Sequence, residues 1–166
     1  ALRTGSEAFA WSTYCQFLKN YGCVVCGIHG SRFVRENVSD SEDGEVAGTA
    51  SDFKAQAQGF RVLIEESGGS IPNDPQTQLD RAIRAVFRSY NSHRARYYRK
   101  TQGIPESLGT AVSVQEMVFG NRSEASGSGV VFSRNPNTGE PGLFGEWVKQ
   151  NQGVGLASGS VTPVRL

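Results

Sequence analysis

A short segment rich in glycine and serine has residue types that could bind phosphate. Ser126-Gly127-Ser128-Gly129 alternates two hydroxyl side chains with two glycines. Because glycine has no side chain, backbone N–H groups at such positions can approach a phosphate closely, and the hydroxyls add donors. The same residue types are also typical of a tight turn. The segment alone leaves a phosphate site and a plain turn as alternatives.

Basic residues gather in one block of the sequence. From residue 81 to residue 100 there are seven Lys or Arg residues and no Asp or Glu: Arg81, Arg84, Arg88, Arg94, Arg96, Arg99 and Lys100. The first three recur at helical spacing and would share one face, and Tyr90, Tyr97 and Tyr98 lie among the others. This combination is typical of a surface that binds the RNA backbone. The alternatives are a solvated helix face and a face that pairs with the acidic segment 40–45.

The three cysteines invite a test for metal binding. Cys23 and Cys26 have the Cys-x-x-Cys spacing, and Cys15 and His29 are close in sequence. Structural zinc sites favour two well-spaced ligand pairs, and the neighbours of these cysteines are apolar, which favours buried thiols. An odd number of cysteines without an extracellular pattern favours a reducing, intracellular compartment. Cytosol and organelle (mitochondrion or plastid) both remain open.

Helices are expected over the first hundred residues. Ser6 is a candidate N-cap for a helix whose apolar residues recur until Gly22. A second helical stretch is expected within residues 24–33. Thr49 or Ser51 is a candidate cap for a third helix, which a glycine pair ends.

The clearest helix follows a turn with two prolines. Asp74 can cap it and Pro75 can be its first residue. The apolar residues of this helix recur on one face: Leu79, Ile83, Val86, Phe87 and Tyr90. A further helix is expected to start after Ser92 and to run to about Lys100.

Strand patterns replace helical ones after Gly109. Residues 111–119 form an alternating segment with β-branched residues, which is the first strand candidate. Residues 129–133 are the second. The turn residues 135–139 separate that candidate from a returning strand over 143–149. Helices followed by an antiparallel sheet predict an α+β fold.

The bulk composition is that of a globular protein. The sequence has 166 residues, of which 37% are hydrophobic and 20% charged, with a formal net charge of +1. This length suits one domain or two small subdomains. The sequence lacks a run of about 18 apolar residues, so we expect no membrane partner. It opens without Met, and we expect a cut, a processed end or the first ordered residue of a longer protein.

Several blocks, in order, resemble the pyruvate, phosphate dikinase family. The most specific is Gly109-Thr110-Ala111-Val112-Ser113-Val114-Gln115-Glu116-Met117-Val118-Phe119-Gly120-Asn121. The blocks before it are Phe9-Ala10-Trp11, Thr49-Ala50-Ser51-Asp52, Asp74-Pro75, Gln78-Leu79, Ala85-Val86-Phe87, Arg94-Ala95 and Tyr98-Arg99. Those after it are Ser126-Gly127-Ser128-Gly129-Val130, Ser133-Arg134-Asn135-Pro136-Asn137-Thr138-Gly139-Glu140 and Phe144-Gly145-Glu146. Their order and spacing cover nearly the whole chain, so the sequence is identified as a member of this family.

The resemblance implies part of an ATP-grasp fold. We expect a helical subdomain over residues 1–105 and an antiparallel β subdomain over residues 106–166, which forms one wall of the ATP cleft. The family converts ATP, phosphate and pyruvate to AMP, pyrophosphate and phosphoenolpyruvate. It uses a phosphohistidine domain, a pyruvate-binding barrel, and an amino-terminal part of the ATP region with a phosphate-binding Lys and an Arg. We expect none of these in this sequence.

The resemblance also assigns candidate site residues. The family's hinge strand, whose backbone and apolar side chains hold adenine, corresponds to Gln115, Glu116, Met117 and Val118; a buried central strand is the alternative. The phosphate segment corresponds to Ser126, Gly127, Ser128 and Gly129. Glu146 and Gln152 correspond to oxygen ligands of the Mg²⁺ that accompanies ATP, and a solvated Glu is the alternative.

The sequence departs from the family pattern near its end. The resemblance implies an acidic pair where Val154 and Gly155 stand, and an Arg where Val161 stands. Val has neither charge nor donor, so it cannot hold the charge of a transferring phosphoryl group. Arg165 would need a register shift to replace that Arg. We therefore expect no intact catalytic residue.

Three functions follow as alternatives. The first is a catalytically degenerate structural subunit of a larger intracellular assembly, with other protein subunits and RNA as partners. The second is the nucleotide-binding fragment of an active dikinase, with Mg-ATP as cofactor. The third is a non-catalytic ATP-sensing module.

Overall fold

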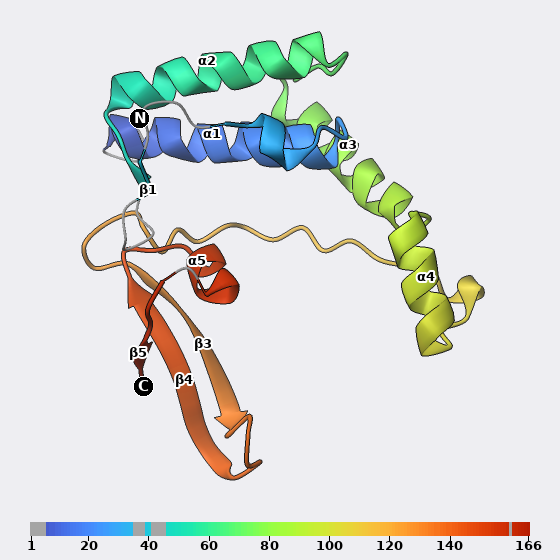
Figure 1. Ribbon diagram of the computed structural model, residues 1–166, viewed down its shortest axis with the longest axis vertical. Helices are drawn as coiled ribbons and strands as arrows, with labels where there is room; N and C mark the ends of the chain where they lie inside the picture. The colour runs from blue at the N-terminus through green and yellow to red at the C-terminus, as the bar shows by residue number, and fades with distance from the viewer. Residues whose placement is uncertain (1–5, 35–38, 41–45, 160) are drawn as a thin grey trace. The chain divides into compact units, whose positions relative to one another are not determined.

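The computed structural model describes residues 6–34, 39–40, 46–159 and 161–166 (Figure 1). Its chain divides into two compact units, and each combines segments that are distant in sequence. The sheet unit consists of residues 1–12, 35–52 and 116–166, and the helical unit consists of residues 13–34 and 53–115. These units are not consecutive along the chain, whereas the predicted subdomains meet at residue 105. The predicted subdivision concerns the family's ATP region and stays a prediction.

The first helix, α1, spans Glu7–Val24. The predicted cap is confirmed, because Ser6 Oγ accepts a hydrogen bond of 3.2 Å from the Phe9 amide. The predicted helix within residues 24–33 is wrong: this stretch contains only the short 3-10 helix η1, Gly30–Arg32. Gly27 adopts a left-handed φ of 71°, which ends the helical path.

The next helix, α2, spans Ala50–Glu66 and begins with a reciprocal cap. Thr49 Oγ1 accepts from the Asp52 amide at 3.3 Å, and the Thr49 amide donates to Asp52 Oδ2 at 2.9 Å. Thr49, one of the two predicted caps, is therefore confirmed. The helix ends before Gly68, whose φ is 77°.

The buried core of the helical unit lies between α1 and α2, which run side by side in Figure 1. Leu18 and Ile64 are fully buried at 0% exposure. Cys15 Sγ donates to the Phe53 carbonyl at 3.1 Å, which ties the two helices together. A methyl group on Gly22 would collide with the Phe33 ring, so this glycine allows the ring to reach the core.

Two further helices follow, α3 at Pro75–Ser89 and α4 at His93–Gln102. Both predicted starts are confirmed, because Asp74 caps α3 and Ser92 caps α4. The apolar face predicted for α3 is largely exposed, however: Ala85 is the buried residue of this helix, and Phe87 is 47% exposed. The residue that α3 buries is thus not one of the predicted apolar face, because periodicity does not show which side of a helix another element covers.

The sheet unit contains a three-stranded antiparallel sheet in the order β3-β4-β5. Its strands are β3 at Gly127–Arg134, β4 at Pro141–Lys149 and β5 at Val164–Arg165. The predicted turn is confirmed, because Asn135 Oδ1 accepts from the amides of Asn137 and Thr138. Short helices η2 (Glu106–Leu108) and α5 (Gly153–Ser158) and a small hairpin, β1 (Ser39–Asp40) with β2 (Val46–Ala47), complete the description.

These elements confirm the α+β fold class. The acidic residues Glu42, Asp43 and Glu45, to which the basic block could pair, lie outside the described residues. Within the described residues, no helix has both the length and the apolar character to cross a membrane.

The strand predicted over residues 111–119 is wrong. This segment has no regular secondary structure, and Val118 is 91% exposed. Alternating β-branched residues favour an extended backbone, but a strand also needs a neighbour for its N–H and C=O groups. In the described part of the chain this segment pairs with no strand.

Candidate functional site

The predicted phosphate segment is the start of β3 and neither a loop nor a tight turn. Gly127 pairs with Lys149 and Gly129 pairs with Trp147 in the β3–β4 ladder. The pairing even begins one residue earlier, because the Gln150 amide donates to the Ser126 carbonyl at 2.8 Å. The turn lies before Ser126, and the glycines are therefore held by a strand.

The strand directs the two glycine amides outward. In an antiparallel pair, residues alternate between those that bond to the opposite strand and those that point away from it. Since Ser126 bonds to Gln150, the alternation directs Gly127 and Gly129 away from β4. β3 is an edge strand of the described sheet. Its edge thus presents two N–H donors, separated by one residue, that can bind an anionic oxygen.

The two serine hydroxyls have structural partners. Ser128 Oγ donates to the Asn151 carbonyl at 2.8 Å, which holds the segment before α5 against β3. Ser126 Oγ accepts from the Ser123 amide at 3.2 Å and so closes the preceding turn. The hydroxyls therefore shape the site, and the backbone amides are its available donors. Phosphate contact at this edge stays a prediction.

Close packing surrounds the start of β3. A methyl group on Gly120 would collide with Ser128 Oγ and the Asn151 carbonyl. A methyl group on Gly129 would lie 2.9 Å from the Glu146 carbonyl and 3.0 Å from Trp147 Cβ. Both glycines are needed because the backbone passes too close to its neighbours for any side chain.

Glu146 and Gln152, the predicted Mg²⁺ ligands, both belong to the sheet unit. Glu146 is exposed on β4, between its cross-strand partners Val130 and Arg165. Gln152 is the N-cap residue of α5, and its Nε2 donates to Asn121 Oδ1 at 3.1 Å, so its amide oxygen faces elsewhere. One carboxylate and one amide oxygen suit Mg²⁺ when phosphate and water complete the octahedron. The metal assignment stays a prediction.

The predicted adenine-binding residues lie on the unpaired segment before β3. All four side chains (Gln115, Glu116, Met117 and Val118) are exposed. The alternative of a buried central strand is therefore wrong, and adenine contact stays a prediction. The end of the segment is fixed, because Phe119 makes an edge-on ring contact of 5.3 Å with Phe9.

Val161 is buried where the resemblance implies an Arg. It is 7% exposed, and a methyl group on Gly155 would lie 3.2 Å from its Cγ1 atom. The two departures from the family pattern thus lie against each other, and the small Gly155 makes room for Val161. Arg165 is held on β5 opposite Glu146, so β-strand pairing opposes the register shift that would let it replace the missing Arg.

The basic block does not form one exposed face. Arg81 Nη1 donates to Ser70 Oγ at 3.0 Å, and Arg84 Nε makes an ion pair of 2.8 Å with Asp80, which raises the pKa of Arg84. Arg99 is 5% exposed, so its assignment to a partner-binding face is wrong. The exposed members are Arg84, Arg88, Arg94, Arg96 and Lys100.

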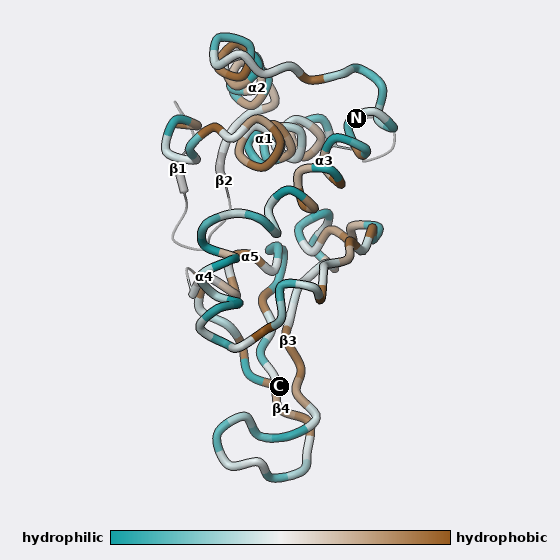
Figure 2. The backbone as a smooth tube through the Cα atoms, turned by 90° about the vertical axis from the view of Figure 1, so that its right-hand side faces the viewer, coloured by the Kyte–Doolittle hydropathy of each residue, from teal (hydrophilic) through white to brown (hydrophobic). Residues whose placement is uncertain are grey.

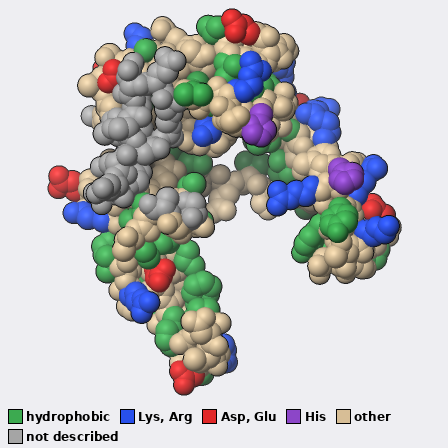
Figure 3. Space-filling view, viewed as in Figure 1, with side chains coloured by type: hydrophobic (Ala, Val, Ile, Leu, Met, Phe, Trp, Pro, Cys, Tyr) green, Lys and Arg blue, Asp and Glu red, His purple; other side chains and the backbone are tan. Residues whose placement is uncertain are grey.

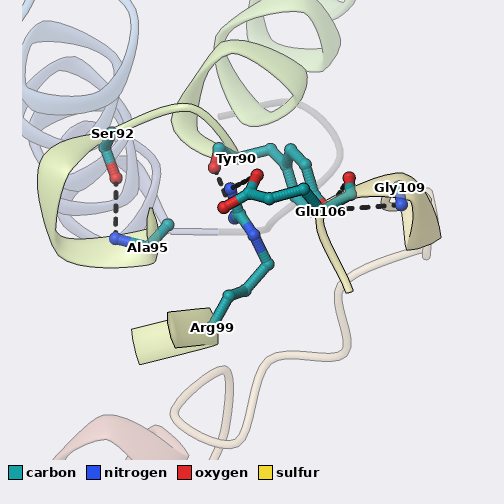
Figure 4. A network of polar contacts seen from close by, with 6 residues as sticks. All are labelled: Tyr90, Ser92, Ala95, Arg99, Glu106 and Gly109. Carbon is teal, nitrogen blue, oxygen red and sulfur yellow. Dashed lines mark hydrogen bonds and ion pairs between the residues drawn. The ribbon is translucent and has the colours of Figure 1, made fainter. Parts of the chain in front are cut away.

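Arg99 is buried because it joins a polar network (Figure 4). Its Nη1 donates to the Tyr90 carbonyl at 2.6 Å, its Nη2 pairs with Glu106 at 2.9 Å, and its guanidinium lies 3.8 Å over the Tyr90 ring. The Tyr90 hydroxyl in turn donates to the Glu106 carbonyl and accepts from the Gly109 amide. Sequence reasoning missed Glu106, because a partner seven residues away across a loop leaves no periodic signal.

The cysteines give no sign of a metal centre. Among the described residues, no three His, Cys, Asp or Glu side chains lie close enough together to hold a metal ion. Cys15 is buried, Cys23 and Cys26 are half-buried, and all three are free thiols. Burial raises the pKa of the Cys26 thiol, which keeps it protonated and less reactive.

Comparison with known proteins agrees with the sequence resemblance. Residues 33–165 match the family described as "Pyruvate phosphate dikinase, AMP/ATP-binding domain". The chain is 41% identical to pyruvate, phosphate dikinase of Clostridium symbiosum, over 98% of this chain and 19% of that protein. It is 40% identical to the chloroplastic pyruvate, phosphate dikinase 1 of Arabidopsis thaliana, over 95% of this chain and 17% of that protein. It is also 40% identical to the pyruvate, phosphate dikinase of Rhizobium meliloti, over 96% of this chain and 18% of that protein. The chain thus spans less than a fifth of the length of these relatives.

Proposed function

Because the chain belongs to the pyruvate phosphate dikinase family, within its AMP/ATP-binding domain, we propose that it supplies one wall of a nucleotide-binding cleft. The complete domain has the ATP-grasp fold in this proposal. The observation that carries it is the edge of β3, where the amides of Gly127 and Gly129 point away from β4. Outward N–H groups at glycines can donate hydrogen bonds to the phosphate oxygens of a nucleotide.

The proposed metal ligands, Glu146 and Gln152, belong to the same unit as this edge. Glu146 is on β4, the neighbouring strand, and adjacent strands are about 4.8 Å apart. A Mg²⁺ ion held by the Glu146 carboxylate and the Gln152 amide oxygen would then share the phosphate oxygens with the glycine amides. The adenine would lie along residues 115–118, which become a paired hinge strand in the complete domain.

We propose that this wall binds nucleotide without transferring a phosphoryl group by itself. Phosphoryl transfer depends on positioning and on stabilising developing charge, and a cation commonly supplies the second. Val161 supplies no charge, and it is buried beside Gly155. In this proposal, the cation for the transition state comes from other parts of the complete protein.

The apolar surface of the sheet unit supports a larger domain. Figure 3 shows hydrophobic side chains exposed along the β3–β4 hairpin, and Figure 2 shows β3 as an apolar stretch. Phe132 is 46% exposed and Leu143 is 79% exposed. Monomeric proteins rarely leave such a contiguous surface open. Since the relatives are more than five times as long as this chain, the proposed cover is the remaining part of a dikinase.

The test is isothermal titration of the full-length protein with Mg·ATP, comparing Glu146→Gln with Glu140→Gln. Glu140 is an exposed carboxylate in the turn between β3 and β4, so its substitution makes the same change of charge away from the proposed metal. We expect Glu146→Gln to weaken Mg·ATP binding about tenfold or more and Glu140→Gln to leave it unchanged. No heat at millimolar Mg·ATP, or equal behaviour of the two variants, would contradict the proposal.

A structural subunit of a larger assembly is the second candidate. It is favoured by the fit between Gly155 and Val161, where an apolar contact stands in place of the charged groups that the resemblance implies. In this case the protein would co-purify with other subunits and would not bind ATP. RNA association is no part of this candidate, because Arg99 is buried and Arg81 and Arg84 bond within the chain.

A further inference from the structure

A separate concave surface lies on α4, entirely within the helical unit. Its cavity has a volume of about 520 Å³ and is lined by His93, Arg96, Tyr97, Lys100, Ile104 and Glu106. The first four have the spacing of neighbours on one helix face, and the last two come from the segment that follows the C-cap Gly103. Small-molecule sites commonly occupy about 300–1,000 Å³. The cavity is therefore large enough for a small ligand.

The cavity carries a positive charge. Arg96 and Lys100 are cations, and within the described part of the chain neither takes part in an ion pair. Glu106 is the acidic residue of the lining, and its carboxylate is bonded to Arg99, whose side chain is only 6% exposed (Figure 4). The ion pair with Arg99 thus neutralises the charge of Glu106. The net positive charge of the cavity then comes from Arg96 and Lys100.

The cavity also has flat and apolar surfaces. Tyr97 is 67% exposed, so its ring is open to stacking by a planar group. Ile104 adds an apolar contact on the segment after the helix. A ligand that fits these walls combines an anionic group for Arg96 and Lys100 with a planar body for Tyr97.

A small anion fits these observations better than a nucleic acid. A nucleic-acid surface needs a continuous series of cations to follow the phosphate backbone. Here Arg81 and Arg84 are engaged within the chain and Arg99 is buried, whereas Arg96 and Lys100 line the same cavity. Figure 3 shows Lys, Arg and His side chains gathered over α4.

We propose that this α4 cavity binds a small phosphomonoester with a planar body. Arg96 and Lys100 hold the phosphate, His93 adds a ring N–H donor, and Tyr97 stacks on the planar group. Every residue of this site belongs to the helical unit, whereas the proposed phosphate and metal contacts of the nucleotide site belong to the sheet unit. The two proposals can therefore fail independently.

The experiment is isothermal titration calorimetry of the full-length protein, once with phenyl phosphate and once with inorganic phosphate. We expect phenyl phosphate to bind about tenfold more tightly than inorganic phosphate, because only the first can stack on Tyr97. Arg96→Gln and Lys100→Gln should each weaken phenyl phosphate binding about fivefold or more. Tyr97→Leu should remove most of the preference for phenyl phosphate over inorganic phosphate.

The matched control is Arg94→Gln, which makes the same charge change at an exposed position of α4 that does not line the cavity. It should leave binding within a factor of two of the original (on the order of 0.4 kcal/mol). Far-UV circular dichroism will check that every variant keeps its helices. Equal losses in Arg94→Gln and Arg96→Gln would indicate the diffuse attraction of a nucleic-acid surface and overturn the proposal. If neither phenyl phosphate nor inorganic phosphate binds at millimolar concentration, the proposal is also overturned.

Discussion

Arg99 shows how one residue of a charged block can become structural. Its neighbours in sequence, Tyr98 and Lys100, are exposed, yet Arg99 is 5% exposed. Arg99 lies on the side of α4 that faces the Tyr90 carbonyl and the Glu106 carboxylate. These two groups accept hydrogen bonds from two of its guanidinium nitrogens. The hydrogen bonds and the ring contact offset the desolvation of the charge.

Replacing Arg99 by Ala should therefore destabilise the protein, and replacing Arg96 by Ala should not. We expect a loss of about 2 kcal/mol in the free energy of unfolding for Arg99→Ala, since two charge-assisted hydrogen bonds and the contact with Tyr90 disappear. Arg96→Ala is the control, because that side chain is exposed. Urea unfolding measures both, and equal midpoints would show that the network contributes nothing.

Val161 allows a second test at the residue scale. Restoring the Arg that the resemblance implies, by Val161→Arg, would place a charge in a buried position beside Gly155. We expect a loss of stability of about 2 kcal/mol or more, because a longer side chain overpacks a buried position and its charge loses hydration. Val164→Arg is the control, since Val164 is 56% exposed. Thermal unfolding that is unchanged in Val161→Arg would contradict the tight packing described for this position.

At the scale of elements, capping residues fix where the helices begin. Asp74 starts α3 by accepting from the Thr77 hydroxyl at 2.6 Å and from the amides of Thr77 and Gln76. These hydrogen bonds hold the pKa of Asp74 below its usual value, and the bond from the Thr77 hydroxyl has the largest effect. The cap thus favours the ionised carboxylate, and its contribution must depend on pH.

The sign of this dependence follows from the lowered pKa. The contribution of ionised Asp74 is fully present above the pKa of an unfolded Asp, about 3.9, and is lost as the pH falls through the lower folded value. Asp74→Ser keeps a capping oxygen but removes the titration. We expect the difference in thermal midpoint between the original protein and Asp74→Ser to change below pH 4 and to stay constant from pH 5 to pH 7. A difference that is constant over the whole range would contradict the linkage.

Two glycines near β3 test how closely its neighbours pack. Gly120→Ala would collide with Ser128 Oγ and the Asn151 carbonyl, whereas a methyl group on Gly153, at the start of α5, has no neighbour within 4 Å. We expect Gly120→Ala to lower the free energy of unfolding by about 1–3 kcal/mol and Gly153→Ala to be neutral or slightly stabilising. Chemical unfolding of both variants measures this difference. A neutral Gly120→Ala would show that the segment before β3 is free to move away.

At the scale of the whole molecule, apolar side chains that the pattern assigns to buried faces remain exposed. The apolar face of α3, segment 114–118 and both strands of the β3–β4 hairpin all contain them. Burial of apolar area is the main favourable contribution to folding and association. The exposed surface therefore supports the proposal that further parts of a longer protein cover it, since the relatives are longer than this chain.

The 166-residue chain on its own should consequently self-associate. We expect Val118→Asp or Leu143→Asp to reduce that association, because these side chains are 91% and 79% exposed in the sheet unit. Val24→Asp is the control, since Val24 is 56% exposed at the end of α1. Sedimentation velocity measures the distribution of species. A monomeric original chain, or an equal effect of the control, would contradict the proposed cover.

The sequence by itself determined the features that depend on near neighbours along the chain. Ser6 and Asp74 were recognisable as caps, Thr49 as one of two candidates, and the start of α4 after Ser92 was expected, because a cap bonds to an amide two or three residues away. The strands and turn of the β3–β4 hairpin and the α+β class followed from the change of period and from the turn residues. The family followed from the order and spacing of short blocks along the chain.

The tertiary structure decided the features that depend on distant neighbours. It made a strand edge of Ser126 to Gly129, left residues 111–119 unpaired, and buried Arg99 beside Glu106. It also placed Val161 against Gly155. Periodicity reports which residues share a face, but burial and pairing depend on what packs against that face, and only three-dimensional contact supplies that information.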